Sequence, residues 1–218
     1  MTRRIVELAG PAGAGKTTLA RALLSDDGRT QLGVEASRIG SMVGALSLGP
    51  VLAGARLSTG GRGWTEGELR NLVYLQAWRR ELASRSSGTY LLDHGPVFRL
   101  AALAAWGPPM ARTPTFRKWW TRTAQSWGRL LDGVVWLDAP DAVLVHRIDS
   151  RERTHRIQNA EAETARAFLA RYRDAYDDVL DLLSQTDTPV LRIDTSTRTP
   201  ESLAATVRSC LLQEVGGG

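Results

Sequence analysis

Cysteine is almost absent from this sequence, since Cys210 is the single cysteine among 218 residues. An intrachain disulfide is therefore excluded, and a reducing compartment is favoured. The N-terminus carries two arginines, but Glu7 and Gly10 follow too soon to leave room for the apolar region of a signal peptide. These absences together predict a cytoplasmic protein.

A long hydrophobic run is also missing. The stretch from Ile39 to Ala55 is uncharged, but it has only 17 residues and is interrupted by several glycines and by Pro50. Such a stretch is too short and too broken for a transmembrane helix. We expect no membrane association, and we interpret this stretch as a flexible region that lines an apolar pocket.

Nearly all of the basic residues are arginine. The net charge is +5, and lysine occurs only at Lys16 and Lys118. The arginines are scattered and no nucleic-acid recognition motif accompanies them, so a nucleic-acid partner is not predicted. The basic excess suits a small anionic ligand such as ATP.

The sequence Gly-Pro-Ala-Gly-Ala-Gly-Lys-Thr at positions 10–17 matches the P-loop pattern G-x-x-x-x-G-K-[ST] at every fixed position. A short apolar strand is predicted before it over 3–9, and a helix after it over 18–24. Glycines let backbone amides close around phosphate oxygens, and the helix N-terminus adds a positive dipole end. The residues expected to contact ATP are Gly10, Ala12, Gly13, Ala14, Gly15, Lys16, Thr17 and Thr18.

Two side chains of this loop carry specific chemistry. Lys16 can reach the β and γ phosphates, where it would neutralise charge on the transferred group. The Thr17 hydroxyl can ligate Mg²⁺. ATP and Mg²⁺ are therefore the predicted cofactors.

Absent motifs exclude several classes of P-loop protein. Regulatory GTPases use an [NT]-K-x-D motif for base recognition, and neither Lys16 nor Lys118 lies in one. Motor and AAA-type ATPases usually end a strand in Asp-Glu, a dipeptide that this sequence does not contain. The stretch 57–61 only faintly resembles the signature of transporter ATPases, and it lies too near the P-loop.

The remaining pattern alternates strands with helices. Buried strands are predicted at 89–93, 133–138 and 189–194, with a short one at 34–36, and helices at 65–86, across most of 97–130, from 141 onward, through 168–183 and from 199 to 211. This alternation predicts an α/β fold, a doubly wound, mostly parallel five-stranded sheet with helices on both faces. One domain should span 1–214, with a disordered tail at 215–218. Ligands should gather at the carboxyl ends of the strands.

Four local features together resemble the small P-loop kinases of nucleosides and nucleotides, especially the thymidylate kinase and deoxynucleoside kinase group. They are the P-loop, the segment Leu91-Leu92-Asp93-His94-Gly95-Pro96, the segment Val135-Trp136-Leu137-Asp138-Ala139-Pro140, and an arginine cluster near 147–156. The resemblance covers most of the chain and implies a P-loop kinase-type fold with a helical lid at about 147–160. It also implies an acceptor-side insert at about 97–130.

The strand-end carboxylate is the first site residue that this resemblance implies. Asp93 is the candidate general base, or a group that orients Mg²⁺-bound water. His94 stands where the group has an arginine, and with Arg99 it is a candidate for acceptor binding.

Asp138 has two possible roles, which are to hold a Mg²⁺-bound water and to cap the following helix. Trp106, Trp119 and Trp120 either pack in the core or stack on a planar acceptor.

The arginine cluster near 147–156 is the second part of the site that this resemblance implies. Arg151 and Arg153 are predicted to be catalytic, closing over the phosphates with Arg156. Arg147 lies four residues before Arg151 on the expected face of one helix, and it is predicted to contact ATP as the first lid arginine. The alternative for the whole cluster is a solvated helix face.

The predicted function is that of an ATP- and Mg²⁺-dependent kinase. Its acceptor would be a small molecule, either a nucleoside, a nucleotide or another hydroxyl-bearing metabolite or antibiotic. The alternative is a non-kinase P-loop ATPase that acts as a regulatory or assembly switch. The oligomeric state is left open, a homodimer included.

Overall fold

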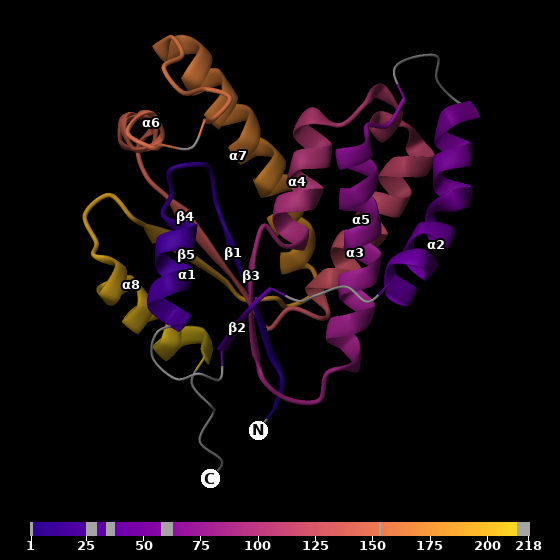
Figure 1. The fold of residues 1–218 in the computed structure, drawn as a ribbon, viewed down its shortest axis with the longest axis horizontal. Helices are drawn as coiled ribbons and strands as arrows, with labels where there is room; N and C mark the ends of the chain where they lie inside the picture. Colours follow the sequence, from indigo (N-terminus) through magenta and orange to yellow (C-terminus); the bar gives the residue numbers. More distant parts are fainter. Residues whose placement is uncertain (1, 25–29, 34–37, 58–62, 153, 213–218) are drawn as a thin grey trace.

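Five parallel strands form the centre of the molecule, in the order β2-β3-β1-β4-β5 (Figure 1). The computed structural model describes residues 2–24, 30–33, 38–57, 63–152 and 154–212. The strands are β1 (Arg4–Ala9), β2 (Thr30–Leu32), β3 (Thr89–Asp93), β4 (Gly133–Asp138) and β5 (Val190–Asp194). The predicted doubly wound sheet is confirmed, and all five strands are parallel.

Helices cover both faces of this sheet, and alternate residues of β1 point to the two layers. Ile5 and Ala9 belong to one core, while Val6 and Leu8 belong to the other. The first core packs mainly against α3 (Glu66–Ser84), α4 (Pro96–Trp106), α5 (Pro114–Gly128) and α7 (Ala162–Ser184). The second packs mainly against α1 (Lys16–Leu24), α6 (Asp141–Asp149), α8 (Pro200–Val207) and the terminal turn η2 (Arg208–Leu212).

Local signals in the sequence place several helix ends correctly. Thr65 and Glu68 form a capping box at the start of α3, as their spacing predicts. Thr199 caps α8, which has a proline at its first position. The interruption after α4 is a short 3₁₀ turn, η1 (Pro109–Arg112), before Thr113 caps α5.

The interpretation of 39–55 as a flexible region is wrong. The stretch forms a continuous helix, α2 (Arg38–Leu57), whose Leu48 is buried. Its Gly44 approaches α3 so closely that a Cβ would lie 3.2 Å from the Val73 carbonyl oxygen. Glycine here allows helix contact rather than chain flexibility. In the described part of the chain, no helix is long and apolar enough to cross a membrane.

The second strand also differs from the prediction. It lies at Thr30–Leu32, where it pairs with β3, a few residues before the expected position. The predicted strand at 34–36 and the predicted tail at 215–218 lie outside the described residues.

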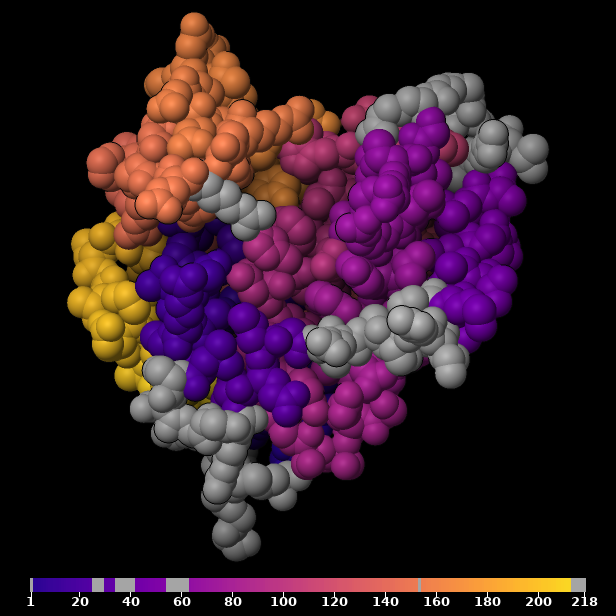
Figure 2. Space-filling model, viewed as in Figure 1, coloured from indigo at the N-terminus to yellow at the C-terminus, as the bar shows by residue number. Residues whose placement is uncertain are grey.

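The lid segment, residues 147–160, begins in the last turn of α6, and its described part includes a turn at 156–159 before α7 begins at Ala162. Helix α6 ends at Asp149, with Ser150 as its C-cap, so Arg151 is not on that helix. The expectation that Arg147 and Arg151 share one helix face is therefore wrong. In the space-filling view, the orange residues of the lid segment and the start of α7 lie on one side of a notch, and magenta and purple residues lie on the other (Figure 2).

Candidate active site

The loop between β1 and α1 has the backbone conformation of a phosphate cradle. Gly10, Gly13 and Gly15 have φ values of 142°, 86° and 91°, a region that favours glycine. A Cβ on Gly10 would lie 2.1 Å from the Leu137 carbonyl oxygen, and one on Gly13 would lie 2.7 Å from that of Leu144. Strand β4 and helix α6 thus support the loop from behind. Its amides lead into the N-terminus of α1, where an anion is stabilised.

Lys16 is directed over this loop. Its ammonium donates hydrogen bonds to the carbonyl oxygens of Gly10 at 2.8 Å and Pro11 at 2.9 Å. The hydroxyl of Tyr176, from α7, donates to the same Gly10 carbonyl at 3.2 Å. Burial lowers the pKa of Lys16 to about 8, while the nearby Asp93 carboxylate acts in the opposite direction. A phosphate beside this ammonium would favour its charged form.

Thr17 and Asp93 meet across the carboxyl edge of the sheet. They do so because β1 and β3 are neighbours, with Leu8 in register with Asp93. The Thr17 hydroxyl donates to Asp93 Oδ2 at 3.2 Å. Asp93 Oδ1 lies 3.3 Å from His94 Nδ1 and has no hydrogen-bond partner in the described residues. The strand-end carboxylate therefore has a buried oxygen available beside the P-loop.

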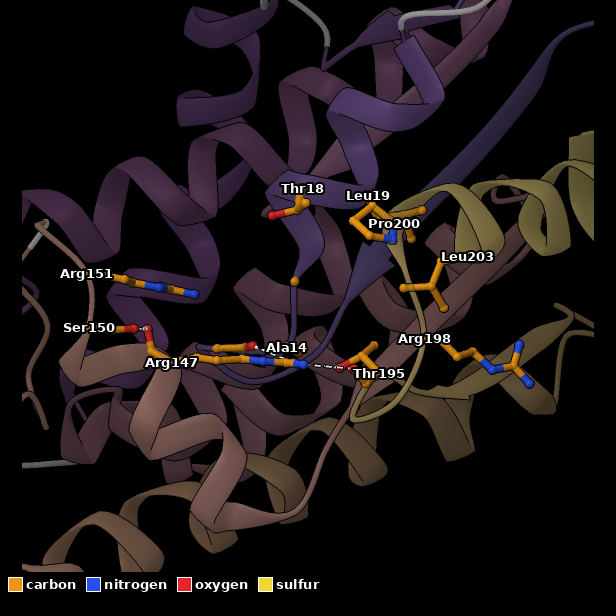
Figure 3. Close-up of a pocket in the computed structure, with 12 residues that line it drawn as sticks. Ala14, Thr18, Leu19, Arg147, Ser150, Arg151, Thr195, Arg198, Pro200 and Leu203 are labelled. Atoms are coloured by element: carbon orange, nitrogen blue, oxygen red, sulfur yellow. Dashed lines mark hydrogen bonds between the residues drawn. The ribbon is translucent and has the colours of Figure 1, made fainter.

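A pocket of about 340 Å³ opens next to the loop, a size that suits a small ligand (Figure 3). The Arg147 guanidinium crosses its floor and donates to the Gly13 carbonyl at 3.3 Å and to the Thr195 carbonyl at 2.8 Å. Arg151 extends toward the P-loop from the same side, whereas Arg198 points away (Figure 3). The lining residues are Gly13, Ala14, Gly15, Thr18, Leu19, Arg147, Ser150, Arg151, Thr195, Arg198, Pro200 and Leu203.

Five of the nine residues that the sequence predicts to contact ATP line this pocket: Gly13, Ala14, Gly15, Thr18 and Arg147. Arg147, in the last turn of α6, and Arg151, just after this helix, both line the pocket, and Arg147 contacts the P-loop directly. Arg153 lies outside the described residues. Gly10, Ala12, Lys16 and Thr17, although part of the P-loop, are not among the residues that line the pocket.

Hydrogen bonds between side chains and the backbone hold the lid segment together. The side-chain amide of Gln158 donates to the carbonyl oxygens of Asp149 at 3.4 Å and Arg151 at 2.9 Å. The backbone amide of Asn159 donates to Asp149 Oδ1 at 2.7 Å. The end of α6 and the start of α7 are thereby joined around Arg151.

The lid segment also rests on aromatic rings of α4 and α7. The Arg156 guanidinium lies 4.7 Å from the centre of the Trp106 ring and 6.0 Å from that of Phe168. The Arg171 guanidinium lies 4.3 Å from the Trp106 ring, which stacks on Phe168 at 5.0 Å. Arg156 thus anchors the segment to the body of the protein, while Arg151 faces the P-loop.

Asp138 is bound by an arginine and does not cap the following helix. Arg173, from α7, donates to Asp138 Oδ2 at 2.8 Å and to Oδ1 at 3.1 Å, and also to Asp141 Oδ1 at 2.6 Å. Helix α6 has no side-chain cap, so the capping interpretation is wrong. Sequence reasoning missed Arg173, because an arginine beside the apolar stripe of a long helix carries no distinctive signal.

Glu7 is a second residue that sequence reasoning missed. It is fully buried in β1, where its carboxylate accepts hydrogen bonds from the backbone amides of Val97 at 2.8 Å and Phe98 at 3.0 Å. Burial raises the pKa of Glu7 to about 8, against the two amides and Arg99, which favour the charged form. A lone carboxylate in the apolar strand Ile-Val-Glu-Leu-Ala was the signal that could have found it.

The two candidate acceptor residues lie on the α4 side of Asp93. His94 is half exposed, and its ring packs edge-on against Phe98 at 4.4 Å. The Arg99 guanidinium lies 4.9 Å from the Tyr74 ring and 4.8 Å from the Trp78 ring, and it donates to Asn71 Oδ1. Burial lowers the pKa of Arg99. Of these two residues, His94 contacts the strand-end carboxylate, whereas Arg99 joins α4 to α3.

The sheet order, the P-loop and the lid segment define the P-loop kinase fold. Among solved structures, the chain is similar to deoxyadenosine kinase from M. mycoides, determined with bound dATP. The TM-score is 0.52 and the identity 14%, and the match covers 96% of this chain and all of that one. No protein-family model and no curated protein sequence matches this chain. The similarity therefore establishes the fold.

Proposed function

We propose that this protein is an ATP- and Mg²⁺-dependent kinase that transfers the γ-phosphoryl group to a small-molecule acceptor. One observation carries the proposal: the Asp93 carboxylate lies 3.2 Å from the Thr17 hydroxyl, at the mouth of the P-loop. A phosphoryl-transfer site needs a metal ligand and a carboxylate near the acceptor together at this point. The arginines that line the adjoining pocket supply positive charge for the phosphates.

The residues present fit a Mg²⁺ ion. Kinase Mg²⁺ is usually held by one or two protein oxygens and by substrate phosphates, with water at the remaining positions. Thr17 Oγ1 would provide a protein oxygen, and Asp93 Oδ2 beside it would hold a Mg²⁺-bound water, which leaves Asp93 Oδ1, a buried oxygen with no hydrogen bond, for the acceptor proton. No group of three acidic, histidine or cysteine side chains that could hold a metal by itself occurs among the described residues. Bound Mg²⁺ would neutralise phosphate charge.

Each polar residue then has a role in the transfer. Lys16 and Arg151 would stabilise charge on the phosphoryl oxygens, and Arg147 would support the nucleotide from the floor of the pocket. Asp93 would accept the proton of the acceptor hydroxyl as the new P–O bond forms. Because phosphoryl transfer needs little covalent help, the positions of these groups decide the rate.

The acceptor would approach Asp93 from the α3 and α4 side. His94 and Arg99 are there, together with the rings of Tyr74 and Trp78. This combination suits a planar, hydroxyl-bearing molecule, and a nucleoside meets both conditions. The similarity in fold to a deoxyadenosine kinase makes deoxyadenosine the first acceptor to test.

The direct test is a screen with γ-labelled ATP. Nucleosides, nucleoside monophosphates, sugars and aminoglycosides are supplied separately, and label transfer and ADP release are measured. A kinase releases ADP at a substantial rate only when a suitable acceptor is present and labels that acceptor. Steady hydrolysis without any acceptor, stimulated by a protein partner, would instead support a P-loop switch and contradict the proposal.

A further inference from the structure

Glu7 is placed where a carboxylate is costly. It lies inside a central strand, three residues before Gly10, and its side chain is fully buried. A buried charge lowers stability unless hydrogen bonds or opposite charges compensate for it. An apolar residue would fill this position in β1 at lower cost, so its partners must account for the glutamate.

Those partners are the first amides of α4. The cap residue of this helix, Gly95, has no side chain to satisfy them, and Glu7 accepts from Val97 and Phe98 in its place. Both oxygens of a carboxyl group keep a lone pair, so Glu7 can accept from the two amides with or without its proton. The Glu7 side chain packs closely against Gly95, since a Cβ on Gly95 would lie 2.7 Å from Glu7 Cδ.

A very short turn connects this helix to Asp93. Strand β3 ends at Asp93 and α4 begins at Pro96, which leaves His94 and Gly95 between them. His94 has a φ of 60°, a left-handed conformation that is unfavourable for a residue other than glycine. Such a turn persists only when its surroundings hold it. The position of the first turn of α4 therefore determines how Asp93 leaves the sheet.

We propose that Glu7 is a positioning residue for phosphoryl transfer, because it holds the first turn of α4 and, through the strained His94 turn, the Asp93 carboxylate beside Thr17. The inference rests on the proposed function, in which Asp93 is the base. Glu7 itself does not contact the phosphates or the acceptor. We expect its effect to reach the reaction through the position of Asp93, although its charge also acts on Lys16.

The test compares Glu7→Gln in two backgrounds. The amide keeps the size of the side chain but can accept only one of the two backbone hydrogen bonds. We expect turnover of MgATP with deoxyadenosine, and of MgATP with water as the acceptor, to fall about 10–100-fold, because small misplacements cost this much. The dissociation constant of MgATP should stay within about twofold, since the P-loop is unchanged. In an Asp93→Asn background, Glu7→Gln should change turnover less than about twofold.

Glu68→Gln is the matched control. Glu68 reaches back to the Thr65 amide at the N-terminus of α3, so its substitution also removes a helix-capping bond. It should lower stability and leave turnover unchanged. Amide hydrogen exchange at Val97 and Phe98 should be faster in Glu7→Gln than in the parent protein and normal in the control. If Glu7→Gln does not fold, Glu7→Asp, which is one methylene shorter, replaces it in every measurement.

The outcomes separate the two proposals. A turnover unchanged by Glu7→Gln, or reduced by the same factor with and without Asp93, overturns the positioning role of Glu7. Normal turnover in Asp93→Asn alone overturns the role of Asp93 in the proposed function. A large loss in Asp93→Asn together with normal turnover in Glu7→Gln rejects only the inference about Glu7.

Discussion

The stability of the protein should depend on pH through Glu7. Burial raises the pKa of this carboxyl from 4.5 to about 8 in the folded protein. Between these two values the folded chain holds a proton that the unfolded chain has released. The stabilisation is fully present below pH 4.5 and is lost as the pH rises through about 8.

The number of protons released on unfolding determines how steeply the free energy of unfolding changes with pH. One proton released on unfolding lowers the free energy of unfolding by about 1.4 kcal/mol per pH unit. From pH 5.5 to 7.5 the parent protein should therefore lose about 2–3 kcal/mol relative to Glu7→Gln, which cannot titrate. The charged groups that act on Glu7 are Arg99 and Asp93, and Lys16 is coupled to it. Lys16 itself, with its pKa lowered to about 8, raises stability with pH only above this range.

Urea unfolding, followed by the fluorescence of the seven tryptophans, measures this difference. Both proteins are unfolded at pH 5.5, 6.5 and 7.5 at constant ionic strength, with Glu68→Gln as the control for an exposed carboxylate. The free energy of unfolding of the control should change with pH as that of the parent protein does. If the free energy of unfolding of Glu7→Gln also changes in this way, Glu7 is charged throughout this range. The amides of Val97 and Phe98 would then outweigh burial, and the reasoning would be refuted.

Three further predictions concern the phosphoryl-transfer site. Lys16→Ala should reduce transfer about 10²–10³-fold in a chain whose circular dichroism is unchanged, and near-normal turnover would remove the P-loop from the mechanism. Asp93→Asn should lose most of its turnover while MgATP affinity, measured by calorimetry, changes little; the reverse pattern would make Asp93 a binding group. Arg151→Ala should lower kcat more than it weakens ATP binding, and amide exchange in 154–160 should slow when ATP and acceptor are bound. Equal exchange in both states, with full activity, would leave Arg151 without a role in closure.

The part of the site that the sequence predicts depends on local rules. The P-loop pattern specifies its own backbone, and the strands that carry Asp93 and Asp138 are short apolar runs that end in a carboxylate. Parallel strands bring such ends to one edge, so their meeting with the P-loop follows from topology. Helix caps such as Thr65 were predictable for the same reason, because each partner lies within a few residues.

The parts that the sequence does not predict depend on distant partners. Glu7 contacts the start of α4, 90 residues further along the chain, and Arg173 contacts Asp138 at a separation of 35 residues. The helix α2 was misread because its glycines suggest flexibility, whereas Gly44 serves close packing against α3. The early end of α6 reflects Gln158, whose side chain binds the carbonyl oxygens of Asp149 and Arg151.

The carboxylates at the edge of the sheet differ in what already binds them, and this difference supports Asp93 as the base. Asp138 accepts two hydrogen bonds from Arg173, which an acceptor hydroxyl would have to displace. Asp194, at the end of β5, accepts from the Ser196 amide, and this bond lowers its pKa and its strength as a base. Of the described strand-end carboxylates, Asp93 alone combines contact with the P-loop threonine and a buried oxygen without a hydrogen bond. The arginine bound to Asp138 is therefore an argument for Asp93, at the end of β3, as the proposed base.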